Sequence, residues 1–283
     1  MLGQKVALWN EHEYEKKSDK PVPYMDLYLL QKREYDQEPS ILHHKKRPIV
    51  IICPGGGYEF LSEREAEPIA LKYIAQGFNA AVVQYSVTPY AYPQAILDVA
   101  KAILTIRQNA DEYHVDADQI IVAGFSAGGH LAGSIATMWH ESFLSEYFGV
   151  ESAMLKPNLQ ILCYPVISSG EYAHVGSFDV IAGDDKALRA GLSLENRVSE
   201  KTPPAYIWHT STDDCVPVMN SLLYAEALAK NGVNYEMHIF PKGCHGLSVG
   251  ENETSIGMPD LVNDYITGWV NESINFMNMT FSK

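Results

Sequence analysis

Short apolar runs alternate along the chain with longer segments in which apolar residues recur three and four positions apart. The short runs are typical of buried strands, and the longer period is typical of helices. Their alternation predicts an α/β protein with a mostly parallel central sheet and helices on both faces. The expected strands are 24–30, 49–53, 80–85, 120–125, 160–164, 205–209 and 235–240, and the expected helices are 63–76, 92–109, 126–140, 218–231 and 259–276.

One stretch, Ser168 to Pro204, breaks this alternation. It has no clean period and contains four glycines. We interpret it as a small cap or lid over one end of the sheet. No linker, low-complexity tract or fixed repeat marks a boundary elsewhere, so we expect residues 1–283 to form a single domain.

The formal net charge of −14 argues against a general affinity for nucleic acid or anionic membranes. Small or neutral substrates fit this charge better. The basic run 43–47 is a local exception, which we interpret as a solvated loop before a buried strand. The first residues lack the apolar core of an export signal, and no run approaches the roughly 18 apolar residues of a membrane span. We therefore expect a cytoplasmic protein.

The four cysteines, Cys53, Cys163, Cys215 and Cys244, show no Cys-x-x-Cys spacing. Two of them lie in or at the end of apolar runs. We therefore expect buried free thiols rather than a metal site or a disulfide framework.

The segment 124–130 contains a candidate catalytic residue. It reads Gly-Phe-Ser-Ala-Gly-Gly-His and joins an expected strand to an expected helix. A serine at such a turn, with small residues two positions away on either side, is typical of a nucleophile elbow. Gly124 and Gly128 supply the room that the strained backbone at Ser126 needs. A structural loop with a capping serine is the alternative that these letters alone leave open.

Three glycines follow the expected strand 49–53 in the sequence Pro54-Gly55-Gly56-Gly57-Tyr58. Their backbone N–H groups are unscreened by side chains, so the loop is able to face a developing oxyanion. A tight connection without chemistry is an alternative. A phosphate cradle is less consistent, because no Lys-Ser or Lys-Thr pair follows the glycines.

An acid and a histidine follow two later strands. Asp213 comes after strand 205–209, and His245 comes after strand 235–240 between two glycines. The chain order Ser126, Asp213, His245 is the one expected of an α/β-hydrolase triad. Asp213 and Asp214 read alternatively as caps or turn formers. His209 is interpreted as a satisfied polar group of the core.

With these residues the chain resembles the α/β-hydrolases. Within them it resembles the hormone-sensitive-lipase-like esterases that are grouped with bacterial acetyl xylan esterases and sugar hydrolases. The resemblance covers roughly residues 24 to 280. It is carried by the glycine loop, the serine and histidine segments, and the motifs 65–68, 92–98 and 194–196. The lipase-like relatives have His-Gly-Gly-Gly in the loop where this chain has Pro54, which favours the sugar-esterase branch.

The resemblance implies a serine carboxylesterase that removes short acyl groups, acetyl above all, from sugars or small oligosaccharides. Ser126 would attack the ester, His245 would carry the proton, and Asp213 would orient the imidazole. The other implied roles are oxyanion donors at Gly56, Gly57 and Ala127 and substrate contacts at Tyr58 and His130.

No metal or organic cofactor is implied, and a homo-oligomer stays open. The alternatives are a serine peptidase of the prolyl-oligopeptidase-like group and a non-catalytic binding protein with the same fold.

Overall fold

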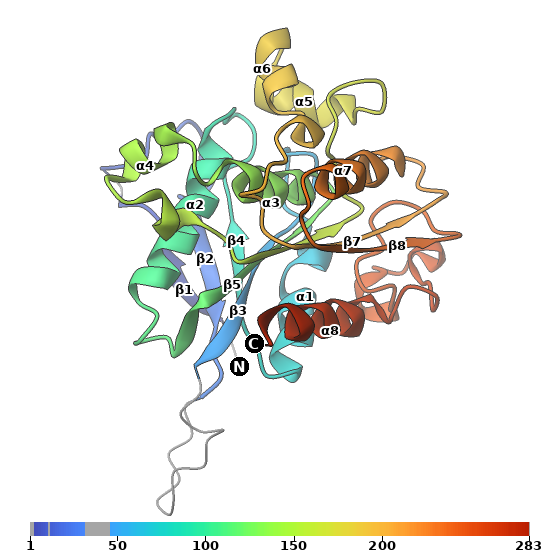
Figure 1. Ribbon diagram of the computed structural model, residues 1–283, viewed down its shortest axis with the longest axis horizontal. Coiled ribbons are helices and arrows are strands. Elements are labelled where there is room, and N and C mark those ends of the chain that lie inside the picture. Colours follow the sequence, from blue (N-terminus) through green and yellow to red (C-terminus); the bar gives the residue numbers. More distant parts are fainter. Residues whose placement is uncertain (1–2, 11, 32–45, 283) are drawn as a thin grey trace, which may run out of the picture.

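The computed structural model describes residues 3–10, 12–31 and 46–282. Its strands form one sheet in the order β1-β2-β4-β3-β5-β6-β7-β8 (Figure 1). The pairs β1·β2 and β2·β4 are antiparallel and the other pairs are parallel, so the prediction of a mostly parallel sheet is confirmed. The strands are β1 (Gln4–Ala7), β2 (Tyr24–Tyr28), β3 (Arg47–Cys53), β4 (Asn79–Gln84), β5 (Val115–Phe125), β6 (Leu159–Cys163), β7 (Ala205–Thr210) and β8 (Tyr235–Phe240).

Helices cover both faces of the sheet, as the sequence pattern predicts (Figure 1). On one side lie α2, α3 and α7, and on the other lie α1 and α8. The α-helices are α1 (Glu67–Ala75), α2 (Gln94–Gln108), α3 (Ala127–Met138), α4 (Ser142–Phe148), α5 (Val175–Ala182), α6 (Lys186–Gly191), α7 (Met219–Lys230) and α8 (Trp269–Phe281).

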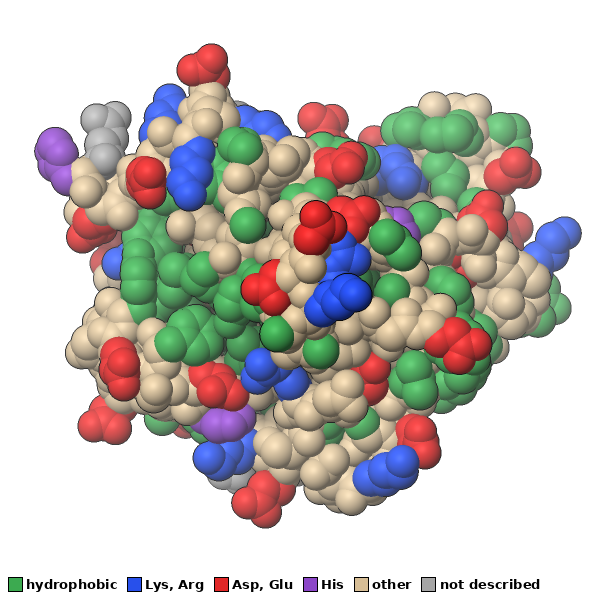
Figure 2. Space-filling view, turned by 90° about the horizontal axis from the view of Figure 1, so that it is seen from above, with side chains coloured by type: hydrophobic (Ala, Val, Ile, Leu, Met, Phe, Trp, Pro, Cys, Tyr) green, Lys and Arg blue, Asp and Glu red, His purple; other side chains and the backbone are tan. Residues whose placement is uncertain are grey.

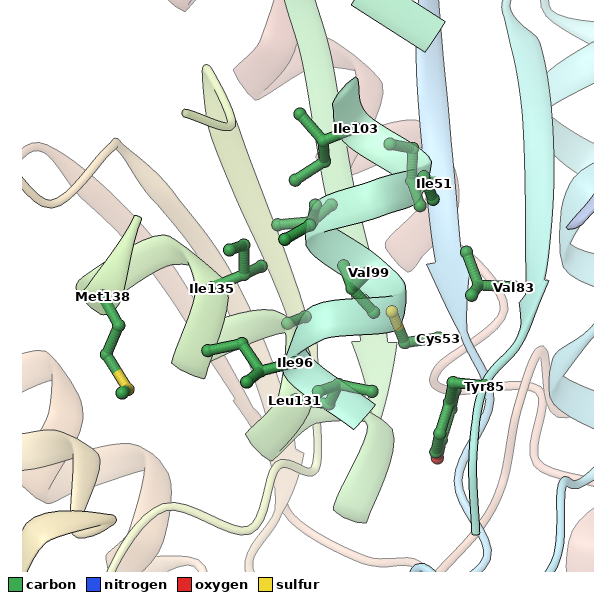
Figure 3. Close-up of a cluster of buried hydrophobic side chains, with 14 of the residues drawn as sticks. Ile51, Cys53, Val83, Tyr85, Ile96, Val99, Ile103, Leu131, Ile135 and Met138 are labelled. Atoms are coloured by element: carbon green, nitrogen blue, oxygen red, sulfur yellow. The ribbon is translucent and has the colours of Figure 1, made fainter. Parts of the chain in front are cut away.

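Each face of the sheet has its own apolar core. Along β3, Ile49 and Ile51 belong to one core and Val50 and Ile52 to the other, because successive side chains of a strand point to opposite faces. Figure 3 shows side chains of α2 and α3 packed over β3 and β4 in the first core. Since both faces are filled, the ends of the strands are left as the place where a site can form.

The sequence predictions differ from the structure near both ends of the chain. A single helix over 259–276 is wrong: the short 3-10 helix η5 (Pro259–Leu261) is followed by turns, and α8 begins only at Trp269. Side chains divert this backbone, since Asn263 accepts a hydrogen bond from the N–H of Tyr265. The edge strand β1 was missed, because it is short and largely exposed and therefore lacks an apolar run.

The segment 168–204 contains α5, α6 and the 3-10 helix η3 (Leu194–Asn196), and α5 and α6 stand beyond the end of the sheet in Figure 1. Backbone hydrogen bonds from Tyr92 to Ile181 and from Leu194 to Ile167 tie it to the rest of the molecule. Its α5 and α6 were not predicted, because they span 8 and 6 residues, too few for a helical period to show. That this segment works as a lid stays a prediction.

The face from which α5 and α6 project carries charges of both signs. Figure 2 shows acidic and basic side chains interspersed on this face. Residues 43–45 of the basic run lie outside the described residues. Within the described ranges, no helix combines the length and the apolar character that crossing a bilayer requires.

Candidate active site

The residues singled out in the sequence gather at one edge of the sheet. The glycine loop follows β3, Ser126 follows β5, Asp213 follows β7 and His245 follows β8. These four strands run parallel, so their carboxyl ends point to the same edge. The topology therefore brings together groups that are far apart in the sequence.

Ser126 has a strained backbone, with φ of 54° and ψ of −121°. A non-glycine residue with positive φ is uncommon, and such strain concentrates at functional turns. The flanking glycines make it possible: a Cβ on Gly124 would lie 2.1 Å from the carbonyl oxygen of Gly128, and one on Gly128 would lie 2.1 Å from that of Cys53. The predicted need for small residues around the serine has this steric cause.

A chain of two hydrogen bonds joins Ser126, His245 and Asp213. The serine Oγ lies 2.7 Å from His245 Nε2, and His245 Nδ1 lies 2.8 Å from Asp213 Oδ2. The imidazole keeps 18% of its side-chain surface exposed, whereas the Asp213 carboxylate keeps 1%. A hydroxyl, an imidazole and a carboxylate thus stand within hydrogen-bonding reach of one another, which is the arrangement that nucleophilic catalysis by a serine requires.

Asp213 is held in place from several sides. Burial by itself would raise its pKa, but the contacts from the imidazoles of His209 and His245 outweigh that effect and hold the pKa well below its usual range. The backbone N–H groups of Cys215 and Val216 also donate to its Oδ1. The carboxylate is therefore charged over the pH range in which an imidazole titrates.

Two neighbours of the triad take supporting positions. His209 is fully buried between Ser221 Oγ and the carbonyl oxygen of Val216, so its interpretation as a satisfied core residue is confirmed. Asp214 accepts a 3.2 Å hydrogen bond from the backbone N–H of His245. It thus helps to shape the turn that carries the histidine.

The glycine loop lies beside the serine. Gly56 and Gly57 adopt positive φ values of 121° and 64°, and both line the same cleft as Ser126 and His245. A Cβ on Gly56 would lie 2.2 Å from the carbonyl oxygen of Phe60, so no other residue fits there. Ala127 begins α3, where first-turn N–H groups lack partners within the helix. These are the three positions predicted as oxyanion donors.

The cleft over Ser126 has a volume of about 600 Å³. Its wall includes Glu59, Arg64 and, from the segment 168–204, His174. The mostly exposed apolar side chains of Phe60 and Ile256 also line it. Such a cleft combines polar and apolar groups in the size range of small-molecule sites.

Tyr58 and His130, which were expected to contact substrate, form a buried pair instead. Tyr58 Oη lies 2.8 Å from His130 Nδ1, and His130 Nε2 lies 2.8 Å from the carbonyl oxygen of Leu192. Neither side chain lines the cleft at Ser126. Burial lowers the pKa of His130 to about 4, against the opposing effect of the bond to Leu192. This pair anchors the segment 168–204 to α3.

The cysteine prediction needs a correction at Cys215. Cys53 and Cys163 are buried free thiols, Cys244 is half-buried, and Cys215 is exposed and lines the cleft. The sequence placed all four inside because cysteine is usually buried. Cys215 lies in the turn between β7 and α7, which faces the site.

Two side chains of the site had no assigned role in the sequence. Glu65 is 3% exposed, although glutamate is rarely buried, and it accepts hydrogen bonds from the N–H of Gly55 and from Tyr164 Oη. Tyr164 packs its ring against that of His245, with centroids 5.1 Å apart. No local pattern reveals this network, because Glu65 and Tyr164 are 99 positions apart. The motif 65–68 was the available signal.

The chain is similar to several known proteins. The family model BD-FAE matches residues 38–162. The crystal structure of an acetyl ester-xyloside bifunctional hydrolase from Caldicellulosiruptor lactoaceticus superposes with a TM-score of 0.81 at 35% identity, covering 98% of this chain and 96% of that one.

Curated relatives are longer than this chain. The chain is 33% identical to endo-1,4-beta-xylanase B of Butyrivibrio fibrisolvens over 88% of its own length and 42% of that protein's. It is 32% identical to an acetylxylan esterase of Xylanibacter ruminicola over 71% of its own length and 41% of that protein's. The chain thus spans about two fifths of these relatives.

Proposed function

Because the chain belongs to the α/β-hydrolase superfamily, among the esterases that resemble acetyl xylan esterases and sugar hydrolases, we propose that it is a serine carboxylesterase acting on short-chain esters. The observation that carries the proposal is the hydrogen-bonded chain from Ser126 through His245 to Asp213, with its 2.7 Å and 2.8 Å contacts. The fold class and the resemblance expected from the sequence are confirmed by the relatives described above.

In the proposed mechanism, Ser126 Oγ attacks the ester carbonyl carbon while His245 Nε2 takes the hydroxyl proton. The tetrahedral intermediate collapses when the imidazolium returns that proton to the leaving alcohol oxygen, which gives an acyl-enzyme. Water then attacks the acyl-enzyme with His245 again as base, and the carboxylic acid leaves as Ser126 recovers its proton. Asp213 holds the imidazole in the required orientation throughout.

The N–H groups of Gly56, Gly57 and Ala127 are the proposed donors to the oxyanion. These donors stabilise the transition state because they are already oriented before charge develops on the carbonyl oxygen. Removing one such donor costs roughly 3 kcal/mol of transition-state stabilisation in characterised hydrolases. The positive φ values at Gly56 and Gly57 support the assignment, because they turn the backbone of the loop within the cleft.

The proposed substrates are acetyl esters of sugars or small oligosaccharides. Support comes from two of the relatives described above, an acetylxylan esterase and an acetyl ester-xyloside hydrolase. The mixed wall of the cleft, with Glu59 and His174 beside Phe60, suits an alcohol that has both hydroxyl groups and an apolar face. The single domain, the cytoplasmic location and a homo-oligomer stay predictions.

The decisive experiment compares wild-type protein with Ser126→Ala on a short-chain aryl acetate and on acetylated xylo-oligosaccharides. We expect kcat to fall by roughly 10⁴ to 10⁶ in the variant, as in serine hydrolases whose triad is broken. A series of aryl esters of rising acyl length should show a steep decline beyond acetyl. Unchanged turnover in Ser126→Ala contradicts the mechanism, and faster cleavage of peptide amides than of esters would instead indicate a peptidase.

A further inference from the structure

Glu65 lies between the glycine loop and Tyr164, whose ring packs against His245. It ends the 3-10 helix η1 (Glu63–Glu65), which follows the glycine loop, and it is nearly inaccessible to solvent. Both oxygens of its carboxylate are used. Oε2 accepts from the N–H of Gly55 at 2.9 Å, and Oε1 accepts from Tyr164 Oη at 2.6 Å. Burying a carboxylate is costly unless such bonds compensate for the lost water.

On one side, Glu65 fixes the start of the glycine loop against the serine. A Cβ on Gly55 would meet Glu65 Oε2 at 2.7 Å, the carbonyl oxygen of Phe125 at 2.9 Å and Ser126 Cβ at 3.1 Å. Gly55 is therefore confined between the carboxylate and the serine turn. Gly56 and Gly57, the proposed oxyanion donors, follow immediately in the chain.

On the other side, Glu65 acts through Tyr164 on the segment that carries the histidine. Tyr164 Oη donates to Glu65 and accepts from the N–H of Ser248 at 3.0 Å. The ring of Tyr164 lies edge-to-face against that of His245. The hydroxyl proton must point to the carboxylate, because the N–H of Ser248 already occupies the oxygen as a donor.

We propose that Glu65 is a positioning residue that sets the glycine loop and the histidine segment in one fixed relation to Ser126. The proposal rests on the proposed function, since it assigns Ser126 and His245 to the reaction. Glu65 acts through Gly55 and Tyr164. Its loss therefore affects the formation of the transition state more than the affinity for the ground-state ester.

The test replaces Glu65 by Gln, which keeps the shape but exchanges one acceptor oxygen for an NH₂ donor. If the amide oxygen faces Gly55, the NH₂ group faces Tyr164 Oη, whose own proton then loses its acceptor. The readouts are kcat and KM on an aryl acetate and the rate at which a fluorophosphonate labels Ser126. We expect kcat and the labelling rate to fall roughly 10-fold to 100-fold, the size of effect that about 1 Å of misplacement produces, with KM within twofold of wild type.

The matched control is Asp98→Asn. Asp98 is a fully buried carboxylate that accepts from Trp9 Nε1 and from the N–H of Ser86, away from the cleft. This variant should label at the wild-type rate. Tyr164→Phe tests the same proposal if Glu65→Gln does not fold. The double variant Glu65→Gln/Tyr164→Phe should be labelled no more slowly than the slower single variant, because the two side chains act as one unit.

A Glu65→Gln protein that is folded and labels at the wild-type rate overturns the proposal and leaves the esterase assignment intact. Equal slowing in Asp98→Asn also overturns it, because any buried carboxylate would then have the same effect. If wild-type protein is labelled but cleaves no acetyl ester, the proposed function fails, while the labelling rates still decide the role of Glu65.

Discussion

The serine and the histidine of the site are held in different ways. We call residues 124–138 the serine elbow and residues 241–268 the histidine segment. Every residue of α3 in the serine elbow is buried, and a methyl group on Gly124 or Gly128 would collide with backbone carbonyl oxygens. The histidine segment has no α-helix or strand, and it is half-buried or exposed at many positions.

Different bonds fix the two regions. Backbone atoms in direct contact fix the serine elbow, so its geometry has no route to relax. Side chains from other parts of the chain hold the histidine segment. Arg64 donates to the carbonyl oxygen of Gly246, and Trp269 Nε1 donates to that of Ser248. Ser126 is therefore placed by packing, and His245 is placed by replaceable hydrogen bonds.

The largest effect is expected from Gly128→Ala in the serine elbow. The new Cβ would lie 2.1 Å from the carbonyl oxygen of Cys53 and 2.3 Å from that of Pro54, both of which belong to the backbone. We expect the free energy of unfolding to fall by about 4 kcal/mol or more, measured by urea denaturation.

Gly133→Ala is the control in the same helix. Its Cβ would meet only the side chains of Leu194 and Leu162, and the nearest atom, Leu194 Cδ1, is able to move. Alanine also favours the helix, so the change should be close to neutral. Equal stability of the two variants would contradict the claim that backbone contacts fix the serine elbow.

The next effect concerns acid and the buried His130 of the serine elbow. Its pKa is lowered from 6.5 to about 4 by burial, so between these values the unfolded chain binds a proton that the folded protein does not. Stability is therefore complete above pH 6.5 and falls as the pH drops toward 4, by up to about 3 kcal/mol at roughly 1.4 kcal/mol per pKa unit.

The measurement is the free energy of unfolding of wild type minus that of His130→Gln across this pH range, a difference in which other titrating groups cancel. We expect the difference to shrink by up to about 3 kcal/mol as the pH falls. A difference that is independent of pH would show that folding leaves the pKa of His130 unchanged, which contradicts the prediction.

The smallest effect on stability is expected from Arg64→Met. This change removes the hydrogen bonds from Arg64 Nη1 to the carbonyl oxygens of Gly246 and Thr254. Because the histidine segment is able to open without unfolding the sheet, we expect a global loss of about 1 kcal/mol but much faster amide hydrogen exchange in residues 241–268. Exchange in α3 should stay at the wild-type rate.

Lys72→Met is the matched control. Lys72 also contacts this segment, through an ion pair with Glu251 in which both side chains are about 40% exposed. Exposed ion pairs contribute between about 0 and 1 kcal/mol, so exchange should change little. Equal acceleration in the two variants would mean that Arg64 has no special part in holding the histidine segment.

The sequence predicts the serine elbow better than the histidine segment, and the reason is physical. The elbow follows from local rules: an apolar strand, a strained turn and glycines at fixed offsets. The sheet follows from similar rules, and all seven expected strands overlap with strands of the structure. Their ends differ by at most two positions, except that β5 begins five positions earlier than expected.

The supports of the histidine segment could not be predicted in this way. Tyr164 is bonded to Glu65 across 99 positions and to Ser248 across 84 positions, and apart from the motif 65–68 no local pattern indicates their burial or pairing. The turns at 262–268 were likewise mistaken for helix, because apolar residues happen to recur there at helical spacing. Tyr58 and His130 were expected at the cleft because they lie close in sequence to the glycine loop and to Ser126. Position along the chain does not tell which way a side chain points.

The order of the strands also affects how the protein is made. Ser126 and His245 are separated by 119 positions, and β8 lies at the edge of the sheet. At about 5–20 residues per second, a ribosome needs on the order of ten seconds to pass from one to the other. A growing chain that has reached β7 contains Ser126 but not His245. Under the proposed function, reactivity begins only when synthesis has passed the last strand, and unfinished chains are inert while their sheet is still open.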